Sequence, residues 1–173
     1  MSCMGMSIVS ASKRWIATET GVSGALPEYS IARLQPEQLP QLADLLDSNG
    51  LPSQDCAEQS DIFYGIIKRG RLIAAGGLEP AAEFSLLRSL VVHPRYRGRG
   101  LARLITEFLV AQAQAQGSQA IYLLTETAAD YFEHLGFCRV SRDRVPVAIM
   151  RTRQFASLCP DSASCLLLRL PPN

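Results

Sequence analysis

A short loop rich in glycine and arginine, set between an apolar segment and an amphipathic one, constrains the fold of this chain most. Residues 83–92 before the loop are typical of a strand, and apolar residues recur at helical spacing from Leu101 onward. Gly98 and Gly100 allow backbone dihedral angles that side chains disfavour. The first amide groups of a helix are unpaired and carry a partial positive charge. A strand, a glycine loop and a helix in this order therefore predict an anion site where the helix begins.

The rest of the chain alternates strand and helix patterns, which favours an α/β fold with a mixed sheet. The pattern after residue 29 is β-α-β-β-β-α-β-α-β, with a hairpin around Arg69-Gly70. Strands are predicted at 29–34, 62–68, 71–78, 83–92, 120–124 and 164–170, and helices at 36–47, 101–116 and 127–135, with further helical segments at 53–59 and 147–158.

The length of the chain fits one domain, and its balanced charge does not indicate a polyanionic partner. The 173 residues are 47% apolar, and 17 basic residues nearly balance 16 acidic ones, which gives no argument for nucleic acid. No apolar run approaches the roughly 20 residues of a membrane span. Residues 1–27 lack apolar periodicity and a secretory h-region, so we expect a flexible extension, a domain over 28–173 and a cytoplasmic location.

Cysteine usage predicts no metal site. The five cysteines are scattered, odd in number and without a CxxC pair. Cys159 and Cys165 are near in sequence, but two thiols alone are a weak metal signal.

The spacing of Arg95, Gly98 and Gly100, Arg-x-x-Gly-x-Gly, resembles the signature of the GNAT acetyltransferases. Residues 120–125 and 131–137, ending in Gly-Phe, resemble the family's fifth strand and the helix after it. The resemblance implies the GNAT acyl-CoA N-acyltransferase fold, with helices flanking a mixed sheet that splays between its fourth and fifth strands. It also implies acetyl-CoA as the co-substrate. No Gly-Lys-Ser/Thr follows the loop, unlike in a nucleotide P-loop.

The resemblance places the coenzyme along the strand and the loop. Backbone groups of the strand end would pair with pantetheine, and amides at the helix start would hold the pyrophosphate. The implied coenzyme site comprises Leu90, Val91, Val92, Arg95, Arg97, Gly98, Arg99, Gly100, Leu101, Ala102 and Phe132.

The groups that would move protons depart from the family pattern. Family members commonly carry a tyrosine acid where this chain has Phe132, and Tyr131 is rotated from it by about 100° on a helix. Either Tyr131 or solvent would protonate the thiolate. The usual carboxylate position holds Leu86, so Glu79, Glu83 and Glu126 are the alternatives as base, and we choose Glu79. The predicted catalytic pair is therefore Glu79 and Tyr131.

Arg88 interrupts a strand that is otherwise fit for burial, so its guanidinium needs a carboxylate partner or a wet cleft. One interpretation is an internal pair with Glu79 or Glu83; the other is a clamp on a carboxylate of the acceptor. Ser89 and Thr125 are further candidates for contact with the acceptor.

A narrower resemblance bears on the acceptor. Residues 87–94 and 123–137 resemble the GNAT domain of glutamate N-acetyltransferases, and residues 145–165 resemble bacterial arsenic-resistance-associated N-acetyltransferases. These similarities imply a small amine that bears a carboxylate, either glutamate-like or an organoarsenical.

Three functions follow as hypotheses. The first is an N-acetyltransferase whose partner is a small amine acceptor, with a homodimer left open. The others are a catalytically weak acetyl-CoA sensor and a protein N-acetyltransferase.

Overall fold

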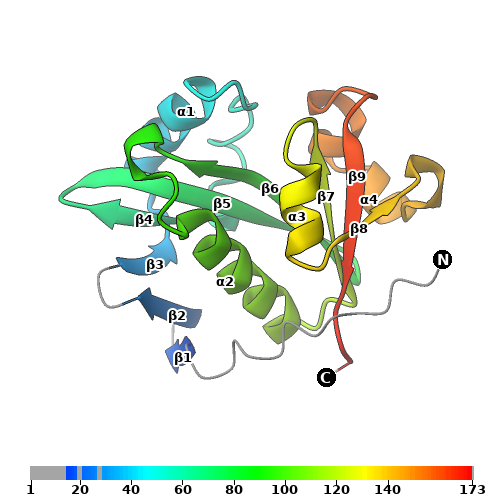
Figure 1. Cartoon of the computed structure of the whole chain (residues 1–173), viewed down its shortest axis with the longest axis horizontal. Coiled ribbons are helices and arrows are strands. Elements are labelled where there is room, and N and C mark those ends of the chain that lie inside the picture. The colour runs from blue at the N-terminus through cyan, green and yellow to red at the C-terminus, as the bar shows by residue number, and fades with distance from the viewer. Residues whose placement is uncertain (1–14, 19–20, 27–28, 173) are drawn as a thin grey trace.

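A nine-stranded mixed sheet organises the computed structural model, which describes residues 15–18, 21–26 and 29–172 (Figure 1). The spatial order is β1-β2-β3-β4-β5-β6-β7-β9-β8, with β6 and β7 parallel and the other described pairs antiparallel. The strands are β1 Trp15–Thr18, β2 Gly21–Leu26, β3 Tyr29–Arg33, β4 Phe63–Lys68, β5 Arg71–Ala81, β6 Phe84–Val92, β7 Ala120–Thr125, β8 Cys138–Val140 and β9 Ser164–Arg169. The predicted α/β class is confirmed.

Helices cover both faces of the sheet, with α2 and α3 on one face and α1 and α4 on the other (Figure 1). The α-helices are α1 Leu39–Asp47, α2 Leu101–Ala115, α3 Ala129–His134 and α4 Val147–Met150. Short 3₁₀ turns are η2 Pro36–Gln38, η3 Ser60–Ile62, η4 Pro94–Tyr96 and η5 Arg142–Arg144, and a π-helix, η6, spans Gln154–Leu158.

The apolar run of β7 is buried on both faces, as a continuous hydrophobic strand predicts. Ile121 and Leu123 pack with α2 and α3, whereas Ala120 and Tyr122 pack in a separate cluster with Ile149 of α4. Successive side chains of a strand point to opposite faces, which explains this alternation. The two clusters anchor β7 in the centre of the molecule.

Most predicted elements are present, and three segments differ. Residues 53–59 were expected to be helical, but residues 54–59 form turns before η3. The short strand β8 was not predicted. Residues 15–18 and 21–26, within the expected N-terminal extension, form β1 and β2. The remainder of that extension, residues 1–14, 19–20 and 27, lies outside the described residues, and the division at residue 28 stays a prediction.

Within the described part of the chain, no helix is long and apolar enough to cross a membrane.

Candidate active site

The site opens where β6 and β7 stop pairing. Their parallel register runs from Phe84 opposite Ala120 to Leu87 opposite Leu123. Beyond this point β6 continues to Val92, and no described strand pairs with its β7-facing edge. Backbone N–H and C=O groups on that edge are therefore available to a ligand. This is the splay that the GNAT resemblance implies.

A β-bulge directs the end of β6 away from β7. The pairing with β5 shifts between Ala75 and Gly77, so that Ser89 and Leu90 lie opposite Gly76 alone. Ser89 has a φ of 54°, a left-handed conformation that non-glycine residues rarely adopt. A Cβ on Gly76 would lie 2.9 Å from Ile105 Cγ2, so the strand has no room for a side chain there. The Gly76-Gly77 pair within a strand is the sequence signal that could have located the bulge.

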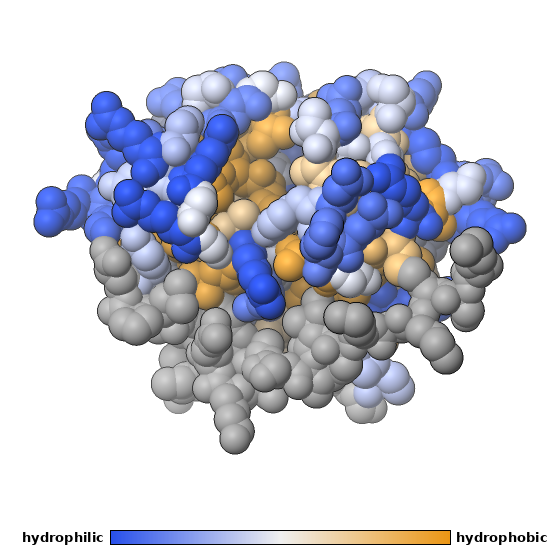
Figure 2. Space-filling view, in the orientation of Figure 1, coloured by the Kyte–Doolittle hydropathy of each residue, from blue (hydrophilic) through white to orange (hydrophobic). Residues whose placement is uncertain are grey.

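A cleft of about 1090 Å³ extends along this splay. Figure 2 shows a hollow on this face, with hydrophobic surface in it and hydrophilic residues around it. The cleft brings together most predicted site residues: Arg88, Ser89, Leu90, Val91, Val92, Arg97, Gly98, Gly100, Leu101, Ala102, Thr125, Tyr131 and Phe132. Glu79, Arg95 and Arg99 do not line it.

One end of the cleft is the loop before α2. Gly98 and Gly100 have φ angles of 73° and 77°, and Gly100 is the N-cap of α2 without a side-chain cap. A Cβ at either glycine would meet no atom within 4 Å, so the backbone is open to solvent there. The loop therefore presents amides and a helix N-terminus to an anion. The amide of Arg97, expected to contact pyrophosphate, donates instead to the Pro94 carbonyl at 3.3 Å.

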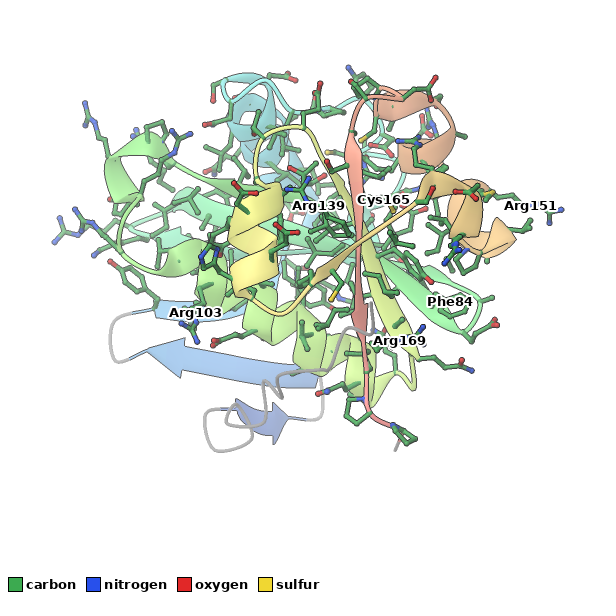
Figure 3. All side chains as sticks on the ribbon, turned by 45° about the vertical axis from the view of Figure 1, so that its right-hand side comes forward. Phe84, Arg103, Arg139, Arg151, Cys165 and Arg169 are labelled. Carbon is green, nitrogen blue, oxygen red and sulfur yellow. The ribbon has the colours of Figure 1, made fainter. Side chains whose placement is uncertain are left out.

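Arginine side chains surround this loop in different ways. Arg97 donates through Nε to the Val92 carbonyl at 3.3 Å and through a terminal nitrogen to Asn49 Oδ1, which ties the loop to the segment after α1. Arg99 lies over the ring of Tyr96, 5.3 Å from its centroid, and Arg95 is exposed. Arg103 projects from the first turn of α2 and pairs with Glu107 at 2.7 Å (Figure 3). The loop is therefore strongly basic, as an anion site requires.

Arg88 forms a buried ion-pair network under the other part of the cleft. Its two terminal nitrogens donate to the two carboxylate oxygens of Asp55, each at 2.6 Å. Nη1 also contacts Gln59 Oε1 at 3.1 Å and Glu79 Oε2 at 3.3 Å. The side chains of Arg88 and Asp55 are fully buried. The internal partner is thus mainly Asp55, with Glu79 as a minor one.

Asp55 was not singled out from the sequence, because it lies in a segment expected to be helical. Burial raises the pKa of its carboxyl, but the hydrogen bonds and charge of Arg88 outweigh burial and hold this pKa below its usual value. Asp55 is therefore ionised at neutral pH. The pair fixes residues 53–59 against β6, and Gln54 beside Asp55 lines the cleft.

The candidate bases are placed differently. Glu79 is largely buried beside Arg88, with a side chain 12% exposed. Glu126 lines the cleft at the end of β7 and is exposed.

Tyr131 and Phe132 occupy adjacent positions on α3 with different environments. Phe132 is 5% exposed and packs edge-on against Phe137, at 5.5 Å between ring centroids. Tyr131 is 36% exposed and lines the cleft. Burial raises the pKa of Tyr131, against the opposing effects of a hydrogen bond with Thr106 and the charge of Arg103. Its phenol therefore keeps its proton at neutral pH.

Arg139 of β8 holds α3 in place. Its guanidinium lies beside α3 (Figure 3) and contacts Asp130 and Glu133, each at 2.9 Å. Because the pair is exposed, its contribution to stability is small. Its effect is to orient the helix that carries Tyr131.

The C-terminal segment supplies a wall of the cleft that the sequence analysis missed. Its lining residues are Gln154, Leu158, Cys159, Pro160 and Ala163. Within the part of the chain described, no group of three His, Cys, Asp or Glu side chains could hold a metal ion.

Comparison with known proteins agrees with this geometry. Residues 59–139 match the family described as "Acetyltransferase (GNAT) domain". Slightly less than half of the chain is thus similar to GNAT acetyltransferases. The matched residues include β5 and β6, which carry Glu79 and Arg88, and also the glycine loop, α2 and α3.

Curated relatives of the GNAT domain are named amino-acid acetyltransferases. Those of Ectopseudomonas mendocina and Pseudomonas syringae pv. syringae are each 32% identical over 99 residues, 56% of this chain and 23% of the relative. The chain thus spans less than a quarter of the length of the curated relatives that it matches.

Solved structures share the GNAT fold. The Mycobacterium tuberculosis protein Rv2747, in complex with CoA, has a TM-score of 0.70 at 19% identity, covering 82% of this chain and 99% of that one. N-acetylglutamate synthase from Neisseria gonorrhoeae, with coenzyme A and N-acetyl-glutamate, has a TM-score of 0.74 at 18% identity, covering 86% of this chain and 36% of that one. Acetyl-CoA fits the cleft as co-substrate, because an open strand edge leads to a basic helix N-terminus.

Proposed function

We propose that this chain transfers an acetyl group from acetyl-CoA to the amino group of a small, amino-acid-like acceptor. The observation that carries the proposal is the continuity of one cleft. It runs from the Gly98–Ala102 loop, along the unpaired edge of β6, to a polar end at Arg88, Glu126 and Gln154. With its pyrophosphate bound at the loop, the coenzyme would extend along β6 and carry its thioester toward that polar end.

The transfer needs a neutral amine, a polarised carbonyl and a proton for the leaving thiolate. The amine nitrogen bonds to the thioester carbon, the carbon–sulfur bond breaks, and the sulfur takes the proton. The backbone N–H of Leu90, in the β6 bulge that lines the cleft, would polarise the carbonyl.

For the proton from the amine, Glu126 is better placed than Glu79. Glu126 lines the cleft and contacts solvent, so it can receive the proton directly or through water. Glu79 is committed to Arg88 and does not line the cleft. Glu79 therefore acts, in this proposal, through the charge that it adds beside Arg88.

For the proton to the thiolate, Tyr131 and solvent remain the two sources. Tyr131 lines the cleft with a protonated phenol, while Phe132 packs into the core and donates nothing.

An amino-acid-like acceptor is supported by the relatives named amino-acid acetyltransferase and by the N-acetylglutamate synthase fold match. The ion pair favours an internal structural role for Arg88, since Asp55 occupies both terminal nitrogens. Because the Arg88 side chain is fully buried, a clamp on the acceptor's carboxylate would require the guanidinium to become accessible from the cleft. The acceptor class is thus proposed from the relatives rather than from Arg88.

Within that class we propose glutamate-like and organoarsenical amino acids as the acceptors to examine first. The resemblance of residues 145–165 to arsenic-resistance-associated acetyltransferases supports the second. A cytoplasmic location and a homodimer stay predictions.

The test is thiol release from acetyl-CoA in the presence of each of the twenty amino acids and an arsenical analogue. Turnover with an amino acid and release of its N-acetyl product are expected. Tight acetyl-CoA binding without turnover of any acceptor would contradict the proposal. It would favour the sensor function, which the replacement of the usual tyrosine by Phe132 also suggests.

A further inference from the structure

Gln154 carries a buried polar atom that the fold does not satisfy. The residue is 7% exposed and lines the cleft from the C-terminal wall. Its side-chain Nε2 donates to Cys159 Sγ at 2.9 Å. Its Oε1 is buried and has no hydrogen-bond partner among the residues that the structure describes. Buried polar atoms are normally paired, so an unpaired oxygen on a residue that lines the cleft points to a missing ligand group.

The backbone around Gln154 is held by its own hydrogen bonds. The Gln154 carbonyl accepts from the Cys159 amide at 3.0 Å, which closes the π-helix η6. Thr152 Oγ1 donates to the Ile149 carbonyl at 2.7 Å and accepts from the Phe155 amide at 3.3 Å. Arg142 lies 4.4 Å from the ring centroid of Phe155. π-Helical turns often occur at functional sites, and this one fixes the amide in the cleft wall.

Gln154 belongs to the end of the cleft away from the phosphate loop. Its partner Cys159 is close enough to Arg88 and Glu126 to experience their charges. Burial raises the pKa of the Cys159 thiol, and the Gln154 hydrogen bond and the nearby arginines offset burial only in part. The thiol is therefore neutral and does not compete for a cationic group.

The charges around this end favour a cation over an anion. Arg88 is accompanied by Asp55 and Glu79, and Glu126 adds a further carboxylate. An amide oxygen can accept a hydrogen bond and cannot donate one. Its complement is consequently a hydrogen-bond donor, either an N–H or an O–H group. The nearby carboxylates favour the N–H of an amine, and a carboxylate oxygen would be repelled.

We propose that Gln154 Oε1 accepts a hydrogen bond from the amino group of the acceptor, so that Gln154 selects amine-bearing molecules at this end of the cleft. This inference rests on the proposed function and assigns the group that recognises the acceptor's nitrogen. A site built to pair a polar substrate group rejects the analogue without it, because the site's own polar atom stays unpaired.

The test uses Gln154→Met, which keeps the length of the side chain and removes both the oxygen and the Nε2 donor to Cys159. Gln112→Met is the matched control, because Gln112 of α2 is also 7% exposed but does not line the cleft. Binding is measured by calorimetry on protein saturated with coenzyme A, which carries no acetyl group to transfer, so no turnover occurs. The probe is whichever of the twenty amino acids most raises the wild-type melting temperature, paired with the acid that lacks its amino group.

In the expected result, Gln154→Met weakens binding of the amino acid about tenfold or more and leaves binding of the desamino acid within about twofold. Gln112→Met leaves both affinities unchanged. Gln154→Glu, which retains an oxygen, binds the amino acid at least as well as Gln154→Met does.

Equal affinities of wild type and Gln154→Met for the amino acid would overturn the inference, and so would the absence of binding by all twenty amino acids. Failure of the proposed function has a different signature. It would be amino-acid binding that depends on Gln154 without any release of thiol.

Discussion

Arg88 and Asp55 form a two-pronged ion pair beneath the cleft, with both Nη–Oδ distances at 2.6 Å and both side chains fully buried. The pair connects β6, which borders the cleft, to the turns at residues 54–59, of which Gln54 lines the cleft. Its geometry satisfies a charge that would otherwise be costly in the core. The pair therefore shapes the cleft from below.

We first predict that Arg88→Ala and Asp55→Ala each lower the free energy of unfolding by about 3–5 kcal/mol, because each removes one partner of a buried ion pair. Urea denaturation measures this loss. The double variant Arg88→Ala/Asp55→Ala is expected to lose less than the sum of the single variants, since neither member of the pair is left without the other.

The same variants distinguish the two roles of Arg88. As an internal support, Arg88→Ala and Asp55→Ala change the KM of the acceptor similarly. If Arg88 clamped the acceptor, Arg88→Ala would raise that KM far more than Asp55→Ala does, and Arg88→Lys would recover only part of the loss.

We next predict an acid-dependent loss of stability that requires Asp55. Its pKa is lowered in the folded protein, so its stabilising effect is complete above the unfolded pKa of about 3.9 and is lost as the pH falls through the lower folded pKa. The difference in unfolding free energy between wild type and Asp55→Asn should be constant from pH 5 to 7 and shrink below about pH 4. If the difference in unfolding free energy stayed constant down to pH 2, this prediction would be wrong.

The coenzyme end of the site was predictable from sequence because its features are local. Gly98, Gly100 and the apolar spacing of α2 are consecutive in the chain, so the strand–loop–helix unit follows from a few rules. The splay between β6 and β7 was predicted only from the resemblance to the GNAT acetyltransferases.

The acceptor end was less predictable because it depends on contacts between distant segments. Arg88 was expected to need a partner, but Asp55 lies 33 residues away in turns without periodicity. Gln154 lies in a π-helix, which no apolar pattern indicates. The bulge at Ser89 had only the Gly76-Gly77 pair on the neighbouring strand as a signal.

We further predict that Gly98→Glu and Gly100→Glu weaken acetyl-CoA binding at least about a hundredfold, which is roughly 2.7 kcal/mol. The new carboxylate repels phosphate and blocks close approach of the backbone. Gly117→Glu is the control, because Gly117 has a similar φ of 79° and equally open space but lies beyond the other end of α2. Calorimetry on the folded variants decides. Unchanged affinity in Gly98→Glu and Gly100→Glu would exclude this loop as the phosphate site.

Tyr131→Phe tests whether α3 supplies the proton for the thiolate. Phe132 is buried against Phe137, and Tyr131 is directed into the cleft beside it, so the chain lacks an acid at the position where the family commonly has one. If solvent protonates the thiolate, the variant keeps most of its kcat, within about threefold. If Tyr131 is the donor, kcat falls about a hundredfold or more, the scale of a lost general acid. The wild-type rate would then also decline at alkaline pH, above the raised pKa of Tyr131, and the variant would lack this decline.

We expect the smaller effect, because a phenol one residue from the usual position is rotated by about 100° around the helix axis. Steady-state kinetics from pH 6 to 11, with acetyl-CoA saturating, separates the two outcomes.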